Sequence, residues 1–199
     1  VSVVFMAVVL LLWRRPREDA GASRERFIPA LRAGGRFVWH EPVVKRILLR
    51  LAMFVAPATA MWALLPIIAK QRLHLAASGY GILFAALGVG AVTGAMVIPK
   101  VKGKLSANGR LTVAALSFGV GLALTVLVPS FVVALLALVV CGLGWTATAS
   151  VLVAELQMFL PQWVRARAVA VYLMTFTAAQ AVASPIWGQV TQHFGVTLA

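Results

Sequence analysis

Acidic side chains are scarce in this sequence. Only 5 of its 199 residues are Asp or Glu, against 18 Lys and Arg, and charged residues make up just 12% of the chain. Hydrophobic residues make up 62%, with a mean hydropathy of +0.96. A soluble domain averages about 25% charged residues, and a chain of this length cannot hide so much apolar surface from water. The composition therefore predicts an all-α protein embedded in a lipid bilayer.

The residues that support metal, redox and nucleotide chemistry are also few. The single cysteine, Cys141, lies in an apolar run and excludes a disulfide within the chain; we expect it to pack between helices. The three histidines stand apart, so we expect no metal site. The phosphate-binding pattern Gly-x-x-x-x-Gly-Lys-Ser/Thr and the nucleophile pattern Gly-x-Ser-x-Gly do not occur. The sequence therefore predicts no cofactor, no direct use of ATP and no enzymatic activity.

The basic residues are numerous, and their placement decides what they mean. A pI near 11.7 would suggest nucleic-acid binding in a soluble protein. Here the Lys and Arg lie in loops beside apolar runs instead of along one helix face. They are typical of topology signals and of attraction to anionic lipid, so we expect membrane lipid as a partner and no nucleic acid.

Six apolar segments follow one another along the chain. The first, 1–13, is too short to cross a bilayer, and we interpret it as the end of a span that begins earlier. Pro57 and Pro66 predict that the next span is kinked or broken, and Pro185 that the last is interrupted. The five complete spans are predicted at about 47–69, 79–98, 111–128, 131–154 and 168–190.

A basic linker, 14–46, separates the first segment from the rest. Its first part is polar and reads as an exposed linker, whereas 27–39 alternates apolar residues with arginines at spacings near three and four. That spacing predicts a short amphipathic helix at the level of the lipid headgroups. Sixteen of the eighteen Lys and Arg fall within 14–50, 99–110 and 160–167. The positive-inside rule therefore predicts that these three loops are cytoplasmic.

This order of segments resembles the major facilitator superfamily, in which a long cytoplasmic loop joins two six-helix halves. The resemblance implies that 1–13 ends helix six, 14–46 is the central loop, and 47–199 is the C-terminal transmembrane domain with helices seven to eleven. Helix twelve and the N-terminal half would lie outside the sequence, and that half is an expected partner.

Local motifs support the resemblance. The Gly79-Tyr80-Gly81 start and the stripe of Gly88, Gly90 and Gly94 are similar to helix eight, where small residues allow close helix packing. The basic loop from Lys100 to Arg110 stands where the family repeats its loop motif, but it lacks the motif's Asp. Glu155 and Arg165-Ala166-Arg167 resemble the acid that ends helix ten and the turn that opens helix eleven, with Ala166 in place of Gly.

Three short sequence segments in the linker and the first full span resemble one bacterial subfamily, which includes the enterobactin exporter. The segments concerned are Leu31-Arg32-Ala33-Gly34, Trp39-His40-Glu41-Pro42 and Trp62-Ala63-Leu64-Leu65-Pro66. The resemblance implies a secondary active exporter, or antiporter, that moves a small amphipathic molecule across the bacterial inner membrane by alternating access. Its substrate would be drug-like or siderophore-like.

Two other functions stay open. A non-transporting scaffold or regulatory protein could use the same fold, with the basic linker as its binding element. A membrane enzyme acting on lipid would need a cluster of His, Asp or Glu at the interface, and the few acids and scattered histidines argue against it.

The candidates for a substrate cavity are polar or aromatic residues at mid-span and the pair between the two prolines of 47–69, because such transporters bind substrate near the midplane, where broken helices mark the site. Each candidate could instead pack against a neighbouring helix. The candidates are Met61, Trp62, Trp145, Thr146, Ser150, Phe176, Thr177, Gln180 and Ser184.

Glu155 is the only acidic residue near a predicted span. It could be a proton-coupling carboxylate. We favour a cytoplasmic gate in which it pairs with Arg165 or Arg167, since a buried carboxylate needs such a partner. Any proton-coupling acid would then lie in the N-terminal half.

Overall fold

The apolar runs that follow residue 40 form five long helices. The computed structural model describes residues 40–194 except 74 and 102; the segment 1–13 and the predicted helix 27–39 lie outside the described residues. All five helices are long and apolar enough to cross a membrane, and the described part of the chain contains no strand. The prediction of an all-α membrane protein is confirmed. The helices are α3 (Pro42–Gln71), α4 (Ala77–Val101), α5 (Ala107–Leu127), α6 (Phe131–Phe159) and α7 (Gln162–Phe194).

Local chemistry explains where two of the helices begin. α3 begins at Pro42, a position where the missing backbone N–H costs nothing because the first N–H groups of a helix have no internal partner. α5 begins after Ser106, whose Oγ accepts a hydrogen bond from the Gly109 N–H at 3.1 Å.

The prolines and the one acidic residue inside the helices behave differently from the predictions. α3 is continuous through Pro57 and Pro66, and α7 is continuous through Pro185, so no proline breaks or interrupts its helix; the kink that is the other expectation for α3 stays a prediction. The Trp187 Nε1–H of α7 donates to the Ala56 carbonyl of α3 at 2.8 Å, which ties the two helices together beside Pro57. Glu155 does not end its helix either, because α6 continues to Phe159.

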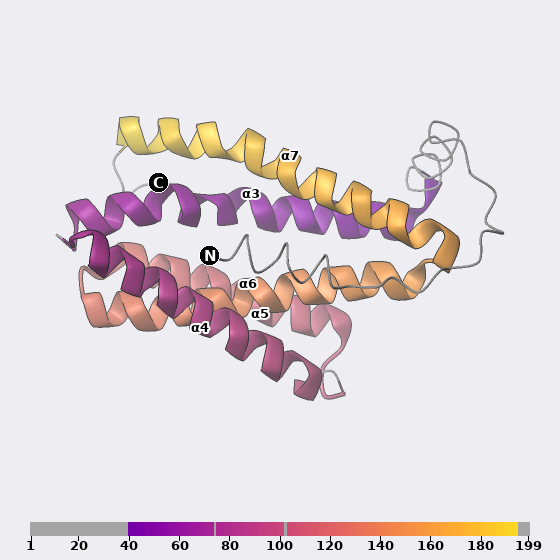
Figure 1. Cartoon of the computed structure of the whole chain (residues 1–199). Helices are drawn as coiled ribbons and strands as arrows, with labels where there is room; N and C mark the ends of the chain where they lie inside the picture. The colour runs from indigo at the N-terminus through magenta and orange to yellow at the C-terminus, as the bar shows by residue number, and fades with distance from the viewer. Residues whose placement is uncertain (1–39, 74, 102, 195–199) are drawn as a thin grey trace, which may run out of the picture. The chain divides into compact units, whose positions relative to one another are not determined.

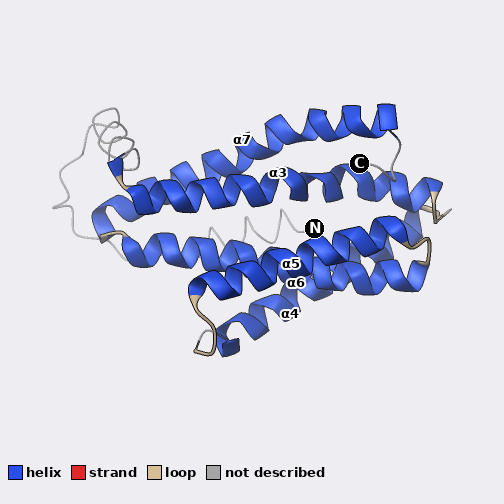
Figure 2. Cartoon of the chain, turned by 180° about the vertical axis from the view of Figure 1, so that it is seen from behind, coloured by secondary structure: helices blue, strands red, loops and turns tan. Residues whose placement is uncertain are grey.

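The helices form two groups that lie side by side (Figure 1, Figure 2). α3 packs mainly on α7, whereas α6 packs between α4 and α5. The turns after α3 and α5 lie at one end of the helices, and the connections after α4 and α6 lie at the other (Figure 2). The second end is the basic end, because it carries the start of α3 and the loop from Lys100 to Arg110.

Glycines let α6 approach both of its neighbours. A Cβ added at Gly142 would collide with the Leu87 carbonyl of α4, and one at Gly144 would lie 2.6 Å from the Ala114 carbonyl of α5. Gly90 of α4 faces the Val139 carbonyl in the same way, and Gly94 faces Leu143. Helix backbones can approach this closely only where no side chain stands between them.

Gly88 does not take part in this packing, contrary to the prediction. A Cβ added there would meet no atom within 4 Å, and the residue is exposed. The reason is helical geometry: two residues of separation turn the chain by about 200°, so Gly88 lies on the face opposite Gly90.

α3 is the most buried of the spans. Half of its most apolar stretch is buried within the protein, compared with 11% for α7. Its side chains enter the core beside α6 and α7 through Leu51 and Val55, and beside α4 and α6 through Met61 and Leu65. α7 instead leaves large apolar side chains exposed, as a helix in contact with hydrocarbon can.

Candidate substrate-binding wall

Trp145, in the middle of α6, is the centre of a cluster of aromatic rings. Its ring centroid lies 5.8 Å from Phe54, 5.9 Å from Trp62, 6.1 Å from Phe118 and 6.0 Å from Phe176. These partners come from α3, α5 and α7, so one side chain joins four helices. Aromatic pairs at such distances contribute about 0.5–1.5 kcal/mol each beyond the area they bury.

The cluster extends along α4 toward the turn that follows α3. Trp62 meets Phe84 edge to face at 5.9 Å, and Phe84 lies 6.2 Å from Tyr80. Phe84 is 43% exposed, so this end of the cluster reaches the surface of the described helices. We call the continuous series of Tyr80, Phe84, Trp62, Trp145 and Phe176 the aromatic row.

Two polar atoms beside the row are buried and have no partner within the described part of the chain: Trp62 Nε1 and Thr148 Oγ1. Other buried threonines are satisfied, because Thr59 and Thr125 donate to carbonyls one turn earlier at 2.8 and 2.9 Å. A buried donor without a partner costs about 1–3 kcal/mol. Such orphaned groups are expected where another molecule supplies the missing hydrogen bond.

A polar stripe on α7 adjoins the row at Phe176. Thr177 and Ser184 are exposed and Gln180 is half-buried, and spacings of three and four place all three on one face. The Thr177 hydroxyl is satisfied by the carbonyls of its own helix at 3.0 and 3.1 Å. A side-chain amide is costly toward hydrocarbon, so this face suits a polar cavity better than lipid.

The remaining cavity candidates have different surroundings. Met61 is 1% exposed and packs in the core beside α4 and α6. Thr146 is half-buried at the close contact between α4 and α6, where its Cβ lies 3.4 Å from the position of a Cβ on Gly94. Ser150, one turn further along α6, is exposed.

The proposed gate residues lie at the basic end; Arg165 has another partner there, and a pair between Glu155 and Arg167 stays a prediction. The Arg165 guanidinium donates to the Leu160 carbonyl at 3.4 Å and not to Glu155, and its buried Nε has no partner among the described residues. Glu155 is half-buried. At the same end, Arg50 of α3 donates to the Asn108 side chain of α5 at 3.0 Å.

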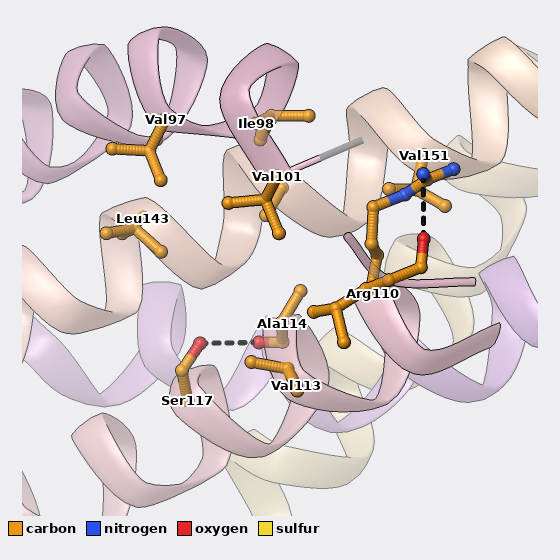
Figure 3. Close-up of a pocket in the computed structure, with 12 residues that line it drawn as sticks. Val97, Ile98, Val101, Arg110, Val113, Ala114, Ser117, Leu143 and Val151 are labelled. Carbon is orange, nitrogen blue, oxygen red and sulfur yellow. Dashed lines mark hydrogen bonds between the residues drawn. The ribbon is translucent and has the colours of Figure 1, made fainter. Parts of the chain in front are cut away.

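Two grooves run along the helices outside the row. One, of about 480 Å³, separates α3 from α5 and is lined by Phe54, Pro57, Phe118 and Thr148, with Arg50 at its basic end. The other, of about 130 Å³, lies between α4 and α5 over α6 (Figure 3).

The sequence does not indicate that several residues belong to the aromatic cluster. Phe54, Phe84 and Phe118 are ordinary apolar residues of their spans, and only the rotation of each helix brings them to the row. Thr148 could have been noticed in the Thr-Ala-Thr-Ala-Ser run of α6. It lies on the face opposite Thr146, however, and only the structure shows that face to be buried. The described residues contain no group of His, Cys, Asp or Glu that could hold a metal ion.

Five membrane-crossing helices, joined by short loops, define an integral, multi-pass membrane protein. The sequence model of the family described as transmembrane secretion effector matches residues 1–199, and the chain belongs to this family of major facilitator transporters. The resemblance to the major facilitator superfamily is thereby confirmed. No curated protein and no solved structure matches the chain.

Proposed function

We propose that the protein is a secondary active exporter of a small amphipathic molecule, which it moves across the bacterial inner membrane by alternating access. The observation that carries the proposal is the aromatic row, which joins α3, α4, α6 and α7 at mid-depth and has an unpartnered indole N–H at Trp62. Aromatic faces bind apolar surface, and a few placed donors fix its orientation. This combination suits a drug-like or siderophore-like molecule better than a small ion.

The polar stripe on α7 supplies the second half of the proposed site. Gln180 would offer a donor and an acceptor beside Phe176, with Thr177 and Ser184 on the same face. Substrate would then lie with its apolar part on the rings and its polar part on α7. Thr148 would receive its partner from a water molecule, since the space of about 10 Å³ that it lines beside Trp145 can hold no more than one.

We propose that α3 to α7 take the places of helices seven to eleven in a twelve-helix transporter, with an N-terminal six-helix half as the opposite wall. The basic end would face the cytoplasm, by the positive-inside rule. Glu155, Arg165 and Arg167 would belong to the gate at that end. The orphaned Arg165 Nε supports this role, because a closed gate would supply its acceptor.

Transport into inverted membrane vesicles tests the proposal. Vesicles that contain the full-length protein should accumulate ethidium, chloramphenicol or iron-free enterobactin faster than vesicles without it. Dissipating the proton gradient should abolish the difference if protons drive the export. If none of these probes accumulates above the empty vesicles, with or without a gradient, the protein is not an exporter of amphipathic molecules.

The alternative function is a scaffold or regulatory protein that uses the same fold. It predicts no transport and a stable complex formed through the linker 14–46. Deleting 17–26 should then abolish its cellular function, whereas an exporter should keep its transport activity in vesicles.

A further inference from the structure

We propose that the groove between α4 and α5 at the basic end is a binding site for one anionic phospholipid. An acyl chain lies in the groove, and the phosphate lies against the basic loop that joins the two helices. This site is distinct from the aromatic row, and the inference does not depend on what the protein transports.

The interior of the groove suits hydrocarbon. Its walls are Val97, Ile98 and Val101 on α4 and Val113 and Ala114 on α5, with side chains of α6 as its floor (Figure 3). The one hydroxyl that lines it, on Ser117, already donates to the Ala114 carbonyl at 2.8 Å. The groove of about 130 Å³ is comparable to the apolar cavity of about 150 Å³ that stays dry and accepts benzene.

The groove is open to the surroundings of the helix bundle. Val97 and Val113, on its two rims, are 39% and 58% exposed. At membrane depth these surroundings are lipid, so a flexible acyl chain can enter from the side. If the groove were empty, the side chains that line it would lose their dispersion contacts on that side.

Positive charge is concentrated at the loop end of the groove. Arg110 lies at this end and is held in place by a hydrogen bond to the Leu105 carbonyl at 3.2 Å (Figure 3). Lys100 and Lys104 are exposed and adjoin the lining residues Val101 and Leu105 in sequence. The Lys104 amide donates to the Val101 carbonyl at 2.9 Å, which closes a turn directly after α4.

These charges select the headgroup. Each Lys or Arg near an anionic lipid surface contributes about 1 kcal/mol, or roughly a fivefold preference. Glu155, one turn beyond Val151 in α6, is the nearest acid on the helix that forms the floor, so three described cations outweigh one carboxylate. The larger groove between α3 and α5 has a single lining cation, Arg50, and no basic loop joins its two helices.

Native mass spectrometry of the purified protein tests whether the site prefers an anionic headgroup. Wild-type protein should retain phosphatidylglycerol over phosphatidylcholine with the same chains by about tenfold or more. The variant Arg110→Gln/Lys100→Gln/Lys104→Gln should lose most of this preference. A matched control, Lys45→Gln/Arg46→Gln, removes charge from the same end but outside the groove and should keep it. Equal retention of the two lipids by the wild type overturns the proposal, and so does an equal loss in both variants.

Photo-crosslinking tests the location and remains informative if the charge variant does not fold. Phosphatidylglycerol with a photoactivatable acyl chain should label the stretch 94–117 and the facing residues of α6. Val97→Trp, which fills the groove and keeps the charges, should lose this label. Val120→Trp should keep it, because Val120 is 56% exposed and does not line the groove. Label that gathers in the groove between α3 and α5, or that spreads evenly over all helices, contradicts the proposal.

Discussion

Trp62 and Trp145 meet edge to face with their ring centroids 5.9 Å apart, and this contact joins α3 to α6 in the middle of the helices. Trp145 is held there because Gly144, the preceding residue, lies against the Ala114 carbonyl of α5. Trp62 therefore presents its ring to a side chain whose place is fixed by backbone packing. Its own N–H remains without a partner among the described residues.

Trp62 of α3 and Trp187 of α7 allow a direct comparison, because only the indole N–H of Trp187 has a hydrogen-bond partner among the described residues. Trp187→Phe removes the hydrogen bond to Ala56 and should lower the free energy of unfolding by about 0.5–1.5 kcal/mol. Trp62→Phe loses a similar area of ring but removes an N–H without a partner among the described residues, so it should destabilise the protein less than Trp187→Phe does. Thermal unfolding in detergent measures both. An equal loss in the two variants would show that the Trp62 N–H is bonded in the folded protein.

The close approach of α6 to α4 predicts a large difference between two glycines. Gly142→Ala should destabilise the protein by about 1–3 kcal/mol, because the new methyl group meets the Leu87 carbonyl and the backbones must separate. Gly88→Ala should be neutral or stabilising by up to about 1 kcal/mol, since alanine favours a helix and meets no atom there. Size-exclusion chromatography after heating measures the fraction of each variant that stays folded. A harmless Gly142→Ala would contradict the packing described for α6.

Orientation can be tested with single added cysteines, because the native Cys141 is fully buried and should not react with maleimide. Pro129→Cys lies in the turn opposite the basic end and should be labelled by an impermeant maleimide on intact cells. Lys104→Cys lies in the basic loop and should be labelled only after the membrane is permeabilised. The reverse pattern would place the basic end outside and contradict the positive-inside assignment.

The helices could be predicted from the sequence because their apolar runs match the thickness of a bilayer. The contacts between helices could not. Helical rotation separates Gly88 from Gly90, so the predicted packing stripe includes one glycine that contacts none of the other described helices. Phe118 reaches Trp145 because α6 lies so close to α5, whereas Phe54 reaches it from α3, and nothing in either span indicates these contacts.

The polar candidates also show that the sequence predicts which residues share a helix face but not what that face contacts. Thr177, Gln180 and Ser184 share a face by spacing alone, which the sequence shows directly. Whether a hydroxyl has a hydrogen-bond partner depends on its neighbours in space, so the spacing of polar residues indicates the satisfied Thr177 and gives no sign of the unsatisfied Thr148. Glu155 resembles the acid that ends helix ten, yet α6 extends one turn beyond it.

The concentration dependence of transport in Trp145→Leu most directly tests whether the aromatic row binds substrate. Leu136→Ala is the control, because Leu136 is 65% exposed on the same helix and lies outside the row. With ethidium as the probe in inverted vesicles, Trp145→Leu should raise KM about tenfold, since a ring contact of about 1.4 kcal/mol is lost, and Leu136→Ala should match the wild type. A wild-type KM in Trp145→Leu, with both variants equally folded, would contradict the assignment of the row as the substrate-binding wall.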